Sequence, residues 1–515
     1  MGAFVMIDAK QVMQAVSASA ASGQPSGPRQ LSPLALMVAA QPTIDAKSPI
    51  VVAGIVRIAE FALIAAIGIV SYFAYVYPQY GQIFDLYYIG TAFAIAALAI
   101  VAFQVVDIYH IHAFRNPVNK LAKLTVAWSL VFLLAVAVLF FARLGDLYSR
   151  VWLAGFFSIG LLALFAYRLT LYGKVRRWSR EGRLDRRAVI VGGGDPGETL
   201  VNTLSTQEDS EVRLLGVFDD RGDERAPNFC GGLPKLGTVD ELVEFARRTR
   251  VDLVLFSLPI SAEGRILEML KKLWVLPVDI RLSAHNNQLR FRPRSYSYIG
   301  KVPVLDVFDR PIADWDVVMK SMFDRVIGAL ALIALSPVML LTALAIRLDS
   351  RGPVLFKQKR YGFNNELIEV FKFRSMYVEQ SDATAVKLVT KGDPRVTRVG
   401  RFIRKTSLDE LPQLFNVVFR GNLSLVGPRP HAVHAKAVDR LYDEAVDGYF
   451  ARHRVKPGIT GWAQINGWRG ETDSQEKIQA RVEHDLYYIE NWSLLFDLYI
   501  LAMTPFSLLK TENAY

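Results

Sequence analysis

Four long apolar blocks constrain the fold of this chain more than any other feature of its sequence. They lie near residues 50–77, 87–109, 124–144 and 151–173. Each is long enough for the hydrocarbon core of a bilayer, which an α-helix of about 20 apolar residues can cross. The sequence therefore predicts an α-helical membrane bundle of four spans over residues 50–173.

The connections between the blocks predict the orientation of this bundle. The stretch "PQYGQIFDL" between the first two blocks contains no Lys or Arg, whereas "YGKVRRWSREGRLDRR", after the fourth block, is dense in both. Because Lys and Arg are retained on the cytoplasmic side of a membrane, we expect both ends of the bundle in the cytoplasm. Arg57, Glu60 and Asp107 lie near the ends of spans or could pair with each other.

Net charge and cysteine content limit the classes of partner, disulfide and metal site that we expect for this chain. The formal net charge of +11 fits cytoplasmic loops and anionic headgroups of membrane lipids. Nucleic acid is not an expected partner, because the sequence has neither a zinc-finger spacing nor an RNA-binding aromatic signature. The single cysteine, Cys230, excludes an intramolecular disulfide and a cysteine metal cluster.

A fifth apolar run, Val326–Ile346, has basic residues on both flanks, which predicts that both of its ends stay in the cytoplasm. Ser336 and Pro337 lie in its middle. Proline removes a backbone hydrogen bond and clashes with the preceding turn, so we expect a bend there, with the Ser336 hydroxyl satisfying a freed carbonyl. We predict a re-entrant membrane hairpin over residues 317–347; an ordinary kinked span is the alternative.

Residues 1–49 are rich in Ala, Ser, Gly, Pro and Gln and show no sustained periodicity. This composition predicts a mostly disordered N-terminal tail. Its first residues lack a basic region before their apolar residues, so a cleaved signal peptide is not expected.

The segment "RRAVIVGGGDPGETLVNTL" predicts a Rossmann-like cytoplasmic α/β domain over residues 185–300. An apolar strand is followed by three glycines in G-x-G-x-x-G spacing, Gly192, Gly194 and Gly197. A second strand ends at Asp219, about where a ribose-binding carboxylate belongs. These residues are candidate nucleotide ligands; the alternative is that the glycines serve only the tight turn. No tyrosine has a lysine four residues later, which argues against a sugar-nucleotide redox enzyme.

In "RKTSLDELPQLFNVV" two acids, Asp409 and Glu410, are adjacent. Taken alone, Ser407 and Glu410 fit a helix capping box. Cationic residues from several segments surround this pair in the sequence, among them Lys372, Arg374, Arg404 and, between two prolines, Arg429. Arg and Lys are suited to phosphate contacts, whereas a solvated basic face is the alternative for each cluster taken singly.

The segments "FKFRSM", "SLDELPQLFNVV", "LSLVGPRP" and "VKPGITGWAQINGW" resemble, in order and spacing, the motifs of bacterial sugar transferases called monotopic phosphoglycosyl transferases. The resemblance covers residues 317–515, and the spans and Rossmann-like domain upstream resemble the large form of this family, the polyprenyl-phosphate hexose-1-phosphate transferases. It implies an α/β monotopic catalytic domain over residues 348–515.

The resemblance also implies a reaction. The family transfers a sugar 1-phosphate from a UDP-sugar to undecaprenyl phosphate, releases UMP and needs Mg²⁺, as the first membrane step of exopolysaccharide or capsule synthesis. Asp409 would attack the sugar-side phosphorus to form an aspartyl phosphosugar, and Glu410 would bind metal or handle a proton. Both acids are the expected Mg²⁺ ligands. The expected phosphate and substrate contacts are Lys372, Arg374, Arg404, Arg429 and, by its match to a further family acid, Asp485.

These features predict a multi-pass protein of the bacterial inner membrane with its catalytic domain in the cytoplasm, where lipid phosphate and UDP-sugar meet. The C-terminal residues "TENAY" and the overall sequence resemble glucose-1-phosphate transferases of exopolysaccharide pathways, which favours glucose over galactose as the transferred sugar. A homodimer through the cytoplasmic module is a further hypothesis. The alternative function is a non-catalytic, nucleotide-sensing membrane regulator of polysaccharide synthesis; a transporter is disfavoured by the charge-poor spans.

Overall fold

The computed structural model describes most of the chain, and the described ranges are 31–42, 46–80, 86–109, 117–207, 212–221, 229–259, 262–283, 297–299, 302–378, 393–430, 436–437, 440–441, 449–468 and 475–509. It forms two compact units. One is Pro42–Arg186, and the other combines the segment that ends at Gln41 with the chain from Arg187 onward.

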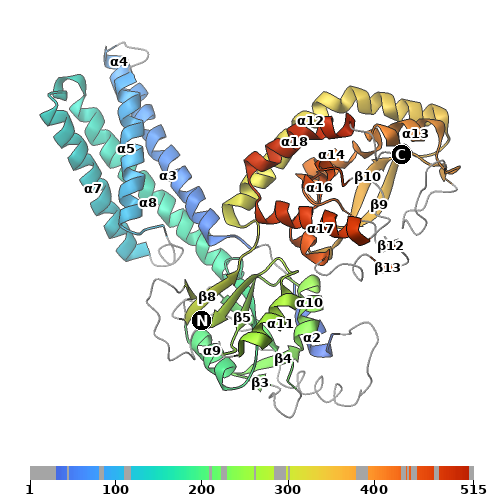
Figure 1. Ribbon diagram of the computed structural model, residues 1–515. Helices are drawn as coiled ribbons and strands as arrows, with labels where there is room; N and C mark the ends of the chain where they lie inside the picture. The colour runs from blue at the N-terminus through green and yellow to red at the C-terminus, as the bar shows by residue number, and fades with distance from the viewer. Residues whose placement is uncertain are drawn as a thin grey trace. The chain divides into compact units, whose positions relative to one another are not determined.

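The first unit is a bundle of long apolar helices (Figure 1). Its helices are α3 (Pro49–Ser71), continued by η1 (Tyr72–Val76) and α4 (Tyr77–Tyr80), then α5 (Leu86–Val105), α7 (Pro117–Phe141) and α8 (Arg150–Arg180), with a short turn η2 (Gly145–Leu147). All four long helices are apolar enough to cross a membrane. Trp128, Trp152 and Phe156 fill the bundle core, while many Leu and Val side chains are exposed on its outside. The protein is thus a membrane protein.

Glu60 is a fully buried charged residue of this bundle. Its Oε1 lies 2.6 Å from Nε of Arg168, and the Tyr109 hydroxyl donates to its Oε2 at 2.7 Å. The sequence suggested that Arg57, Glu60 and Asp107 could pair with each other. The ion-pair partner of Glu60 is instead Arg168 of α8, within the fourth apolar block. A buried carboxylate needs a cation and further donors, and Arg168 and Tyr109 supply them.

Part of the predicted disordered tail is folded. Within residues 1–49, positions 1–30 lie outside the described residues, but Pro33–Ala39 form helix α2. Ser32 accepts a hydrogen bond from the Ala35 backbone as its cap, and its own hydroxyl donates to the Leu236 carbonyl at 2.7 Å. Leu34 and Val38 are buried in the Rossmann-like core. Tertiary burial, rather than local periodicity, therefore orders this short helix.

The domain predicted to be Rossmann-like is a mixed α/β domain built on one sheet of eight strands with the order β3-β4-β2-β1-β5-β6-β8-β7. The strands are β1 (Arg186–Val191), β2 (Val212–Phe218), β3 (Phe229–Cys230), β4 (Leu233–Gly237), β5 (Leu253–Phe256), β6 (Asp279–Ser283), β7 (Ser297–Ile299) and β8 (Val302–Phe308). Strands β1, β5 and β6 are parallel, and β8 returns antiparallel to β6. The predicted boundary at residue 300 is too early, since β8 completes the sheet.

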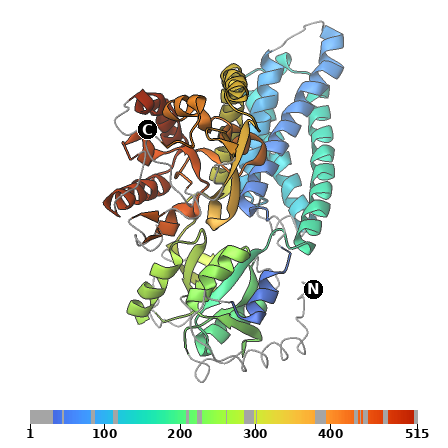
Figure 2. The ribbon, with the colours of Figure 1, turned by 90° about the vertical axis from the view of Figure 1, so that its right-hand side faces the viewer.

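Helices cover both faces of this sheet (Figure 2). They are α9 (Asp195–Ser205), α10 (Val239–Arg248) and α11 (Glu263–Leu273). Alternate β1 residues enter different cores: Val189 and Val191 pack in the core that contains α2, α10 and α11, whereas Ala188 and Ile190 pack in the core that contains α9. This two-sided burial explains why the strand is apolar throughout.

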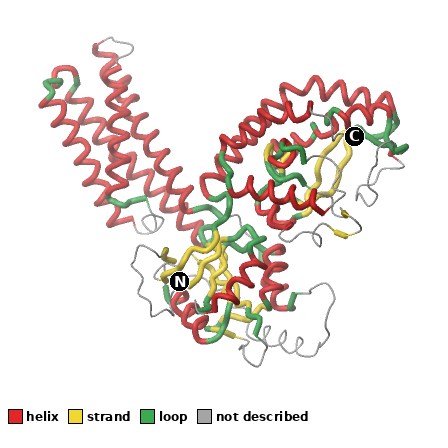
Figure 3. Tube along the Cα trace, in the orientation of Figure 1, coloured by secondary structure: helices red, strands yellow, loops and turns green. Residues whose placement is uncertain are grey.

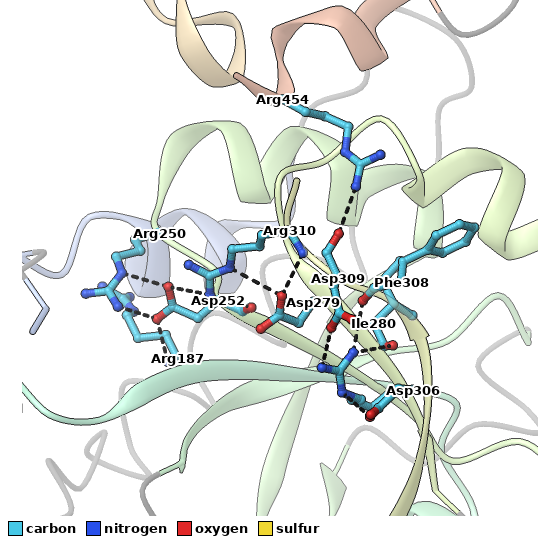
Figure 4. A network of polar contacts seen from close by, with 11 residues as sticks. Arg187, Arg250, Asp252, Asp279, Ile280, Asp306, Phe308, Asp309, Arg310 and Arg454 are labelled. Atoms are coloured by element: carbon cyan, nitrogen blue, oxygen red, sulfur yellow. Dashed lines mark hydrogen bonds and ion pairs between the residues drawn. The ribbon is translucent and has the colours of Figure 1, made fainter. Parts of the chain in front are cut away.

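Charged groups bind the chain after β8 to the N-terminal ends of strands β5 and β6 (Figure 4). Arg310 Nη2 lies 3.1 Å from Oδ1 of Asp252, and the Arg310 backbone donates to Asp279 at 3.0 Å. Arg454, from the C-terminal part of the chain, donates to the Asp309 carbonyl at 3.2 Å. The linker between the Rossmann-like and C-terminal domains is therefore held from both sides.

The fifth apolar run forms one helix, α12 (Asp314–Asp349), which is also long and apolar enough to span a membrane. Figure 1 draws it as one continuous arc, and the re-entrant hairpin over 317–347 stays a prediction. The Ser336 hydroxyl donates to the Ile333 carbonyl at 2.8 Å. That carbonyl is the one Pro337 leaves free, so the predicted role of Ser336 is confirmed and explains why the helix continues through the proline.

The C-terminal domain packs short elements against α12 and is mostly helix and loop (Figure 3). In chain order these are β9 (Leu355–Tyr361), η5 (Phe363–Asn365), β10 (Leu367–Phe373), α13 (Arg398–Lys405), η7 (Leu408–Glu410), α14 (Gln413–Phe415), η8 (Asn416–Arg420), β11 (Ser424–Val426), β12 (Lys436–Ala437), β13 (Arg440–Leu441), η9 (Tyr449–Arg454), β14 (Gly458–Thr460), α16 (Trp462–Ile465), α17 (Gln475–Glu490) and α18 (Leu494–Leu509). Strands β9 and β10 pair antiparallel, and β11 pairs parallel with β14.

A buried polar network joins α12 to this domain. Lys320 Nζ lies 2.6 Å from Oδ2 of Asp497, and the Tyr488 hydroxyl donates to Oδ1 of the same carboxylate at 2.7 Å. Lys320 also donates to the Val426 carbonyl at the end of β11. The network fixes the start of α12 beside the strand that leads into Arg429.

Candidate active site

The acid pair lies on a single tight turn between two helices. Helix α13 is capped by Thr397, whose side chain accepts from the Gly400 backbone at 2.9 Å, and it ends at Lys405. Ser407 then adopts a left-handed conformation with φ 58° and forms no capping hydrogen bond. The capping-box interpretation of Ser407 and Glu410 is therefore wrong, because the Glu410 side chain points instead to cations from other segments.

Two cations hold the Glu410 carboxylate. Lys372 Nζ, from β10, lies 3.0 Å from Oε1, and Arg429 Nη2 lies 2.6 Å from the same oxygen. The three side chains are between 13% and 29% exposed, so solvent reaches them only in part. Segments about 40 and 20 residues away in the sequence thus meet at Glu410, and phosphate binding by Lys372 and Arg429 stays a prediction.

Asp409, next to this group, is half-buried. The pKa of Asp409 is raised to about 6, mainly by burial and also by the negative charge of Glu410. The positive charges of Lys372, Arg404 and Arg429 lower this pKa and so oppose the shift. A carboxylate with this pKa is largely ionised at neutral pH and only partly solvated. Such a group suits nucleophilic attack better than a fully hydrated one.

A pocket opens beside the acid pair. Its lining residues are Arg360, Val370, Lys372, Glu410, Gln413, Arg429, Pro430, Gly458 and Ile459. Three cations and one carboxylate make it suited to a phosphorylated ligand. Arg360 and Gln413 were not predicted. The signal available for Arg360 was the cluster of Lys and Arg in "KQKRYG".

Arg374 is not part of this pocket. Two residues beyond Lys372, it would share that residue's strand face if the strand continued, but β10 ends at Phe373 and the chain turns. The Arg374 guanidinium donates to the carbonyls of Ser350 and Arg351 at 2.8 and 2.5 Å, and the residue is 4% exposed. It holds the chain that leaves α12 rather than a phosphate.

Asp485 also lies away from the pocket lining. Its Oδ2 is 2.5 Å from Nη2 of Arg452, and both side chains are buried. Asp485 was predicted to contact the substrate directly. It forms an ion pair with Arg452 instead and does not line the pocket. Arg404 lies in the last turn of α13, and its charge acts on Asp409.

Comparison with known proteins agrees with this arrangement. Residues 315–511 match the bacterial sugar transferase family, and residues 104–284 match a family described as a CoA-binding domain. The chain is 35% identical over 421 residues to a UDP-glucose:undecaprenyl-phosphate glucose-1-phosphate transferase of Xanthomonas campestris pv. campestris, which covers 81% of this chain and 86% of that relative. The chain belongs to the bacterial sugar transferase family.

Two further relatives of this sugar transferase have similar names. An Escherichia coli (strain K12) protein with the same name as the Xanthomonas one is 35% identical over 82% of this chain and 89% of its own length. An undecaprenyl-phosphate glucose phosphotransferase of Komagataeibacter xylinus is 42% identical over 65% of this chain, and the match spans 61% of that relative. The enzyme class predicted from the motifs is the class of these relatives.

Side chains of the protein itself contact the glycine motif of this sugar transferase. Gly192 and Gly194 have φ of 97° and 75°, which explains the need for glycine at both. Asp219 accepts from the Gly193 backbone at 2.7 Å and pairs with Arg221 at 2.6 Å. Gly197 packs against the Gly192 carbonyl and Cys230, where a Cβ would not fit. Nucleotide binding at Gly192, Gly194, Gly197 and Asp219 stays a prediction.

Proposed function

We propose that this protein transfers a hexose 1-phosphate from a UDP-sugar to undecaprenyl phosphate and releases UMP. The observation that supports this most is the position of Asp409 beside Glu410, whose carboxylate is held by Lys372 and Arg429 at the wall of a pocket. Glucose is the proposed sugar, because the three relatives described above are named for glucose.

The reaction would proceed in two displacements at one phosphorus. A carboxylate oxygen of Asp409 forms a bond to the sugar-bearing phosphorus, the bond from that phosphorus to the UMP oxygen breaks, and UMP leaves with the electron pair. A phosphate oxygen of undecaprenyl phosphate then attacks the same phosphorus, and the Asp409 carboxylate leaves. Lys372 and Arg429 reduce the repulsion between the carboxylate and the diphosphate in both steps.

The acid pair also fits a Mg²⁺ ion. Mg²⁺ is usually bound by one or two carboxylates together with water and substrate phosphates. Among the described residues no group of three or more His, Cys, Asp or Glu side chains could hold a metal ion. The donors proposed for Mg²⁺ are therefore the adjacent carboxylates of Asp409 and Glu410 together with substrate phosphates. When bound there, the ion would neutralise charge on the diphosphate.

The membrane arrangement would bring the two substrates together. Basic residues flank both ends of α12, which supports a re-entrant helix with both ends in the cytoplasm of the bacterial inner membrane. The lipid phosphate lies at that leaflet and the UDP-sugar is cytosolic, so the catalytic domain would meet both. A homodimer stays a hypothesis.

The test is UMP release by full-length protein in nanodiscs with Mg²⁺, undecaprenyl phosphate and a panel of UDP-sugars. Wild-type protein should release UMP with UDP-glucose in a lipid-dependent manner, and Asp409→Asn should not. Asp306→Asn, which changes a half-exposed aspartate of the Rossmann-like domain, is the matched control and should keep activity.

A second readout addresses the covalent step. With UDP-glucose and no lipid acceptor, intact-mass measurement should find one added hexose phosphate on wild-type protein and none on Asp409→Asn. Activity that survives in Asp409→Asn would move the nucleophile elsewhere. Silence with every donor would overturn the proposed reaction and leave the nucleotide-sensing regulator as the function to pursue.

A further inference from the structure

Arg452 is a fully buried arginine that does not line the pocket. Its side chain is 0% exposed, and it comes from η9, a turn that precedes the segment "VKPGITGW". Its Nη2 makes two contacts, one with the Asp485 carboxylate at 2.5 Å and one with the Arg429 carbonyl at 2.8 Å. A single guanidinium thus joins a buried acid on α17 to the backbone of a pocket residue.

The backbone around Arg429 is held at two consecutive carbonyls. Arg452 donates to the carbonyl of Arg429, and Arg360 donates to the carbonyl of Pro430 at 3.1 Å. Prolines on both sides of Arg429 fix φ at their own positions. The backbone is therefore constrained from β9 and from η9, and the Arg429 side chain reaches Glu410 from this fixed base.

We propose that Arg452 and Asp485 form a positioning pair that acts through Arg429 on the acid pair. This inference rests on the proposed transfer reaction and adds two residues to it. Asp485 keeps the Arg452 guanidinium in place, Arg452 holds the Arg429 backbone, and Arg429 holds Glu410 beside Asp409. Neither Arg452 nor Asp485 touches substrate in this scheme.

The energetic cost of the pair supports a positioning role. Burying two charges loses much of their hydration free energy, and an apolar pair of similar size often stabilises a fold as well. An apolar pair could not donate to a carbonyl. The arginine is required because one planar guanidinium can bind a carboxylate and a carbonyl at the same time.

The first test compares Arg452→Gln and Asp485→Asn with wild type in UMP release. Displacing a catalytic group by about 1 Å can cost on the order of 100-fold in rate, so both variants should lose kcat on that scale. Arg452→Lys should recover part of the loss, because lysine keeps the charge opposite Asp485. Arg454→Gln is the matched control: it removes an arginine of the same turn that contacts Asp309 instead, and it should keep wild-type kcat.

A double-mutant cycle gives the sharpest result. If Arg452 acts through Arg429, then Arg452→Gln should reduce kcat little further in an Arg429→Gln background. Losses that multiply would overturn the proposal. A cryo-EM structure of nanodisc-held Arg452→Gln decides the question even if wild-type protein releases no UMP: the Arg429–Glu410 contact must be lost, and its persistence would refute the positioning pair whatever the reaction is.

Discussion

Arg429 and Lys372 share one oxygen of Glu410, at 2.6 and 3.0 Å. One carboxylate thus faces two cations, so the three groups together keep a net positive charge. A diphosphate that enters the pocket offers stronger anionic oxygens to the same two groups. The contact with Glu410 therefore keeps the cations beside Asp409 in the geometry in which substrate needs them.

This contact predicts that arginine at position 429 cannot be replaced by another cation. Arg429→Lys keeps the charge but loses the forked donor geometry, so kcat/KM for UMP release should fall on the order of 10- to 100-fold. Arg420→Lys, a change in a half-exposed surface pair with Glu369, is the control and should have little effect. Equal kcat/KM for Arg429→Lys and wild type would mean that charge alone suffices.

The pH dependence of activity should follow Asp409. Its pKa of about 6 predicts that kcat/KM falls below about pH 6, as the nucleophile becomes protonated. Lys372 lowers this pKa and Glu410 raises it. Lys372→Gln should then move the acid limb to higher pH, and Glu410→Gln should move it to lower pH. Shifts in the same direction for both variants would contradict the assignment of the limb to Asp409.

The raised pKa also has a consequence for stability. Because the folded pKa of Asp409 is above its ordinary value of 3.8, the folded state binds the proton more tightly than the unfolded state between about pH 4 and 6. The ionised carboxylate therefore destabilises the fold above about pH 6, and this cost disappears as the pH falls toward 4. Asp409→Asn should melt at a higher temperature than wild type at pH 7.5, with a smaller difference at pH 5.

Arg374 should prove structural rather than catalytic. Arg374→Gln leaves the carbonyls of Ser350 and Arg351 without their buried donor, which should cost about 1–3 kcal/mol of stability. The melting temperature should fall, while KM for the UDP-sugar stays unchanged in the protein that remains folded. Arg248→Gln, a surface arginine in a helical pair, serves as the control. A tenfold higher KM of Arg374→Gln for the UDP-sugar would instead indicate that Arg374 contacts the substrate.

The parts of the fold that the sequence predicted best are those set by local pattern. Apolar length alone identified the four long helices of the bundle, and the G-x-G-x-x-G spacing identified the strand–turn–helix at β1 and α9. Helix α2 was missed because it has seven residues and is ordered by burial against β4 and α10. No local pattern in so short a segment reports a partner that lies far along the chain.

In the candidate site, too, local sequence patterns predicted some residues, and contacts between distant segments determine the others. Lys372, Arg429, Asp409 and Glu410 come from segments that resemble family motifs, and the structure brings all four together. Arg374 was misplaced because the two-residue rule for one strand face applies only while the strand continues, and β10 stops one residue earlier. Arg452 was missed because its role depends on a carbonyl, and a backbone acceptor leaves no mark in the sequence.

The place of α2 in the chain sets an order of events during synthesis. About 190 residues separate this helix from β4, and the bundle of residues 42–186 lies between them. At 5–20 residues per second, roughly 10–40 s pass before β4 leaves the ribosome. Leu34 and Val38 lack their complete sheet during this interval, while the apolar helices of the bundle are synthesised. The sheet domain can therefore close only after the bundle has been made, and a chain that stalls before β4 keeps the apolar face of α2 open to chaperones and proteases.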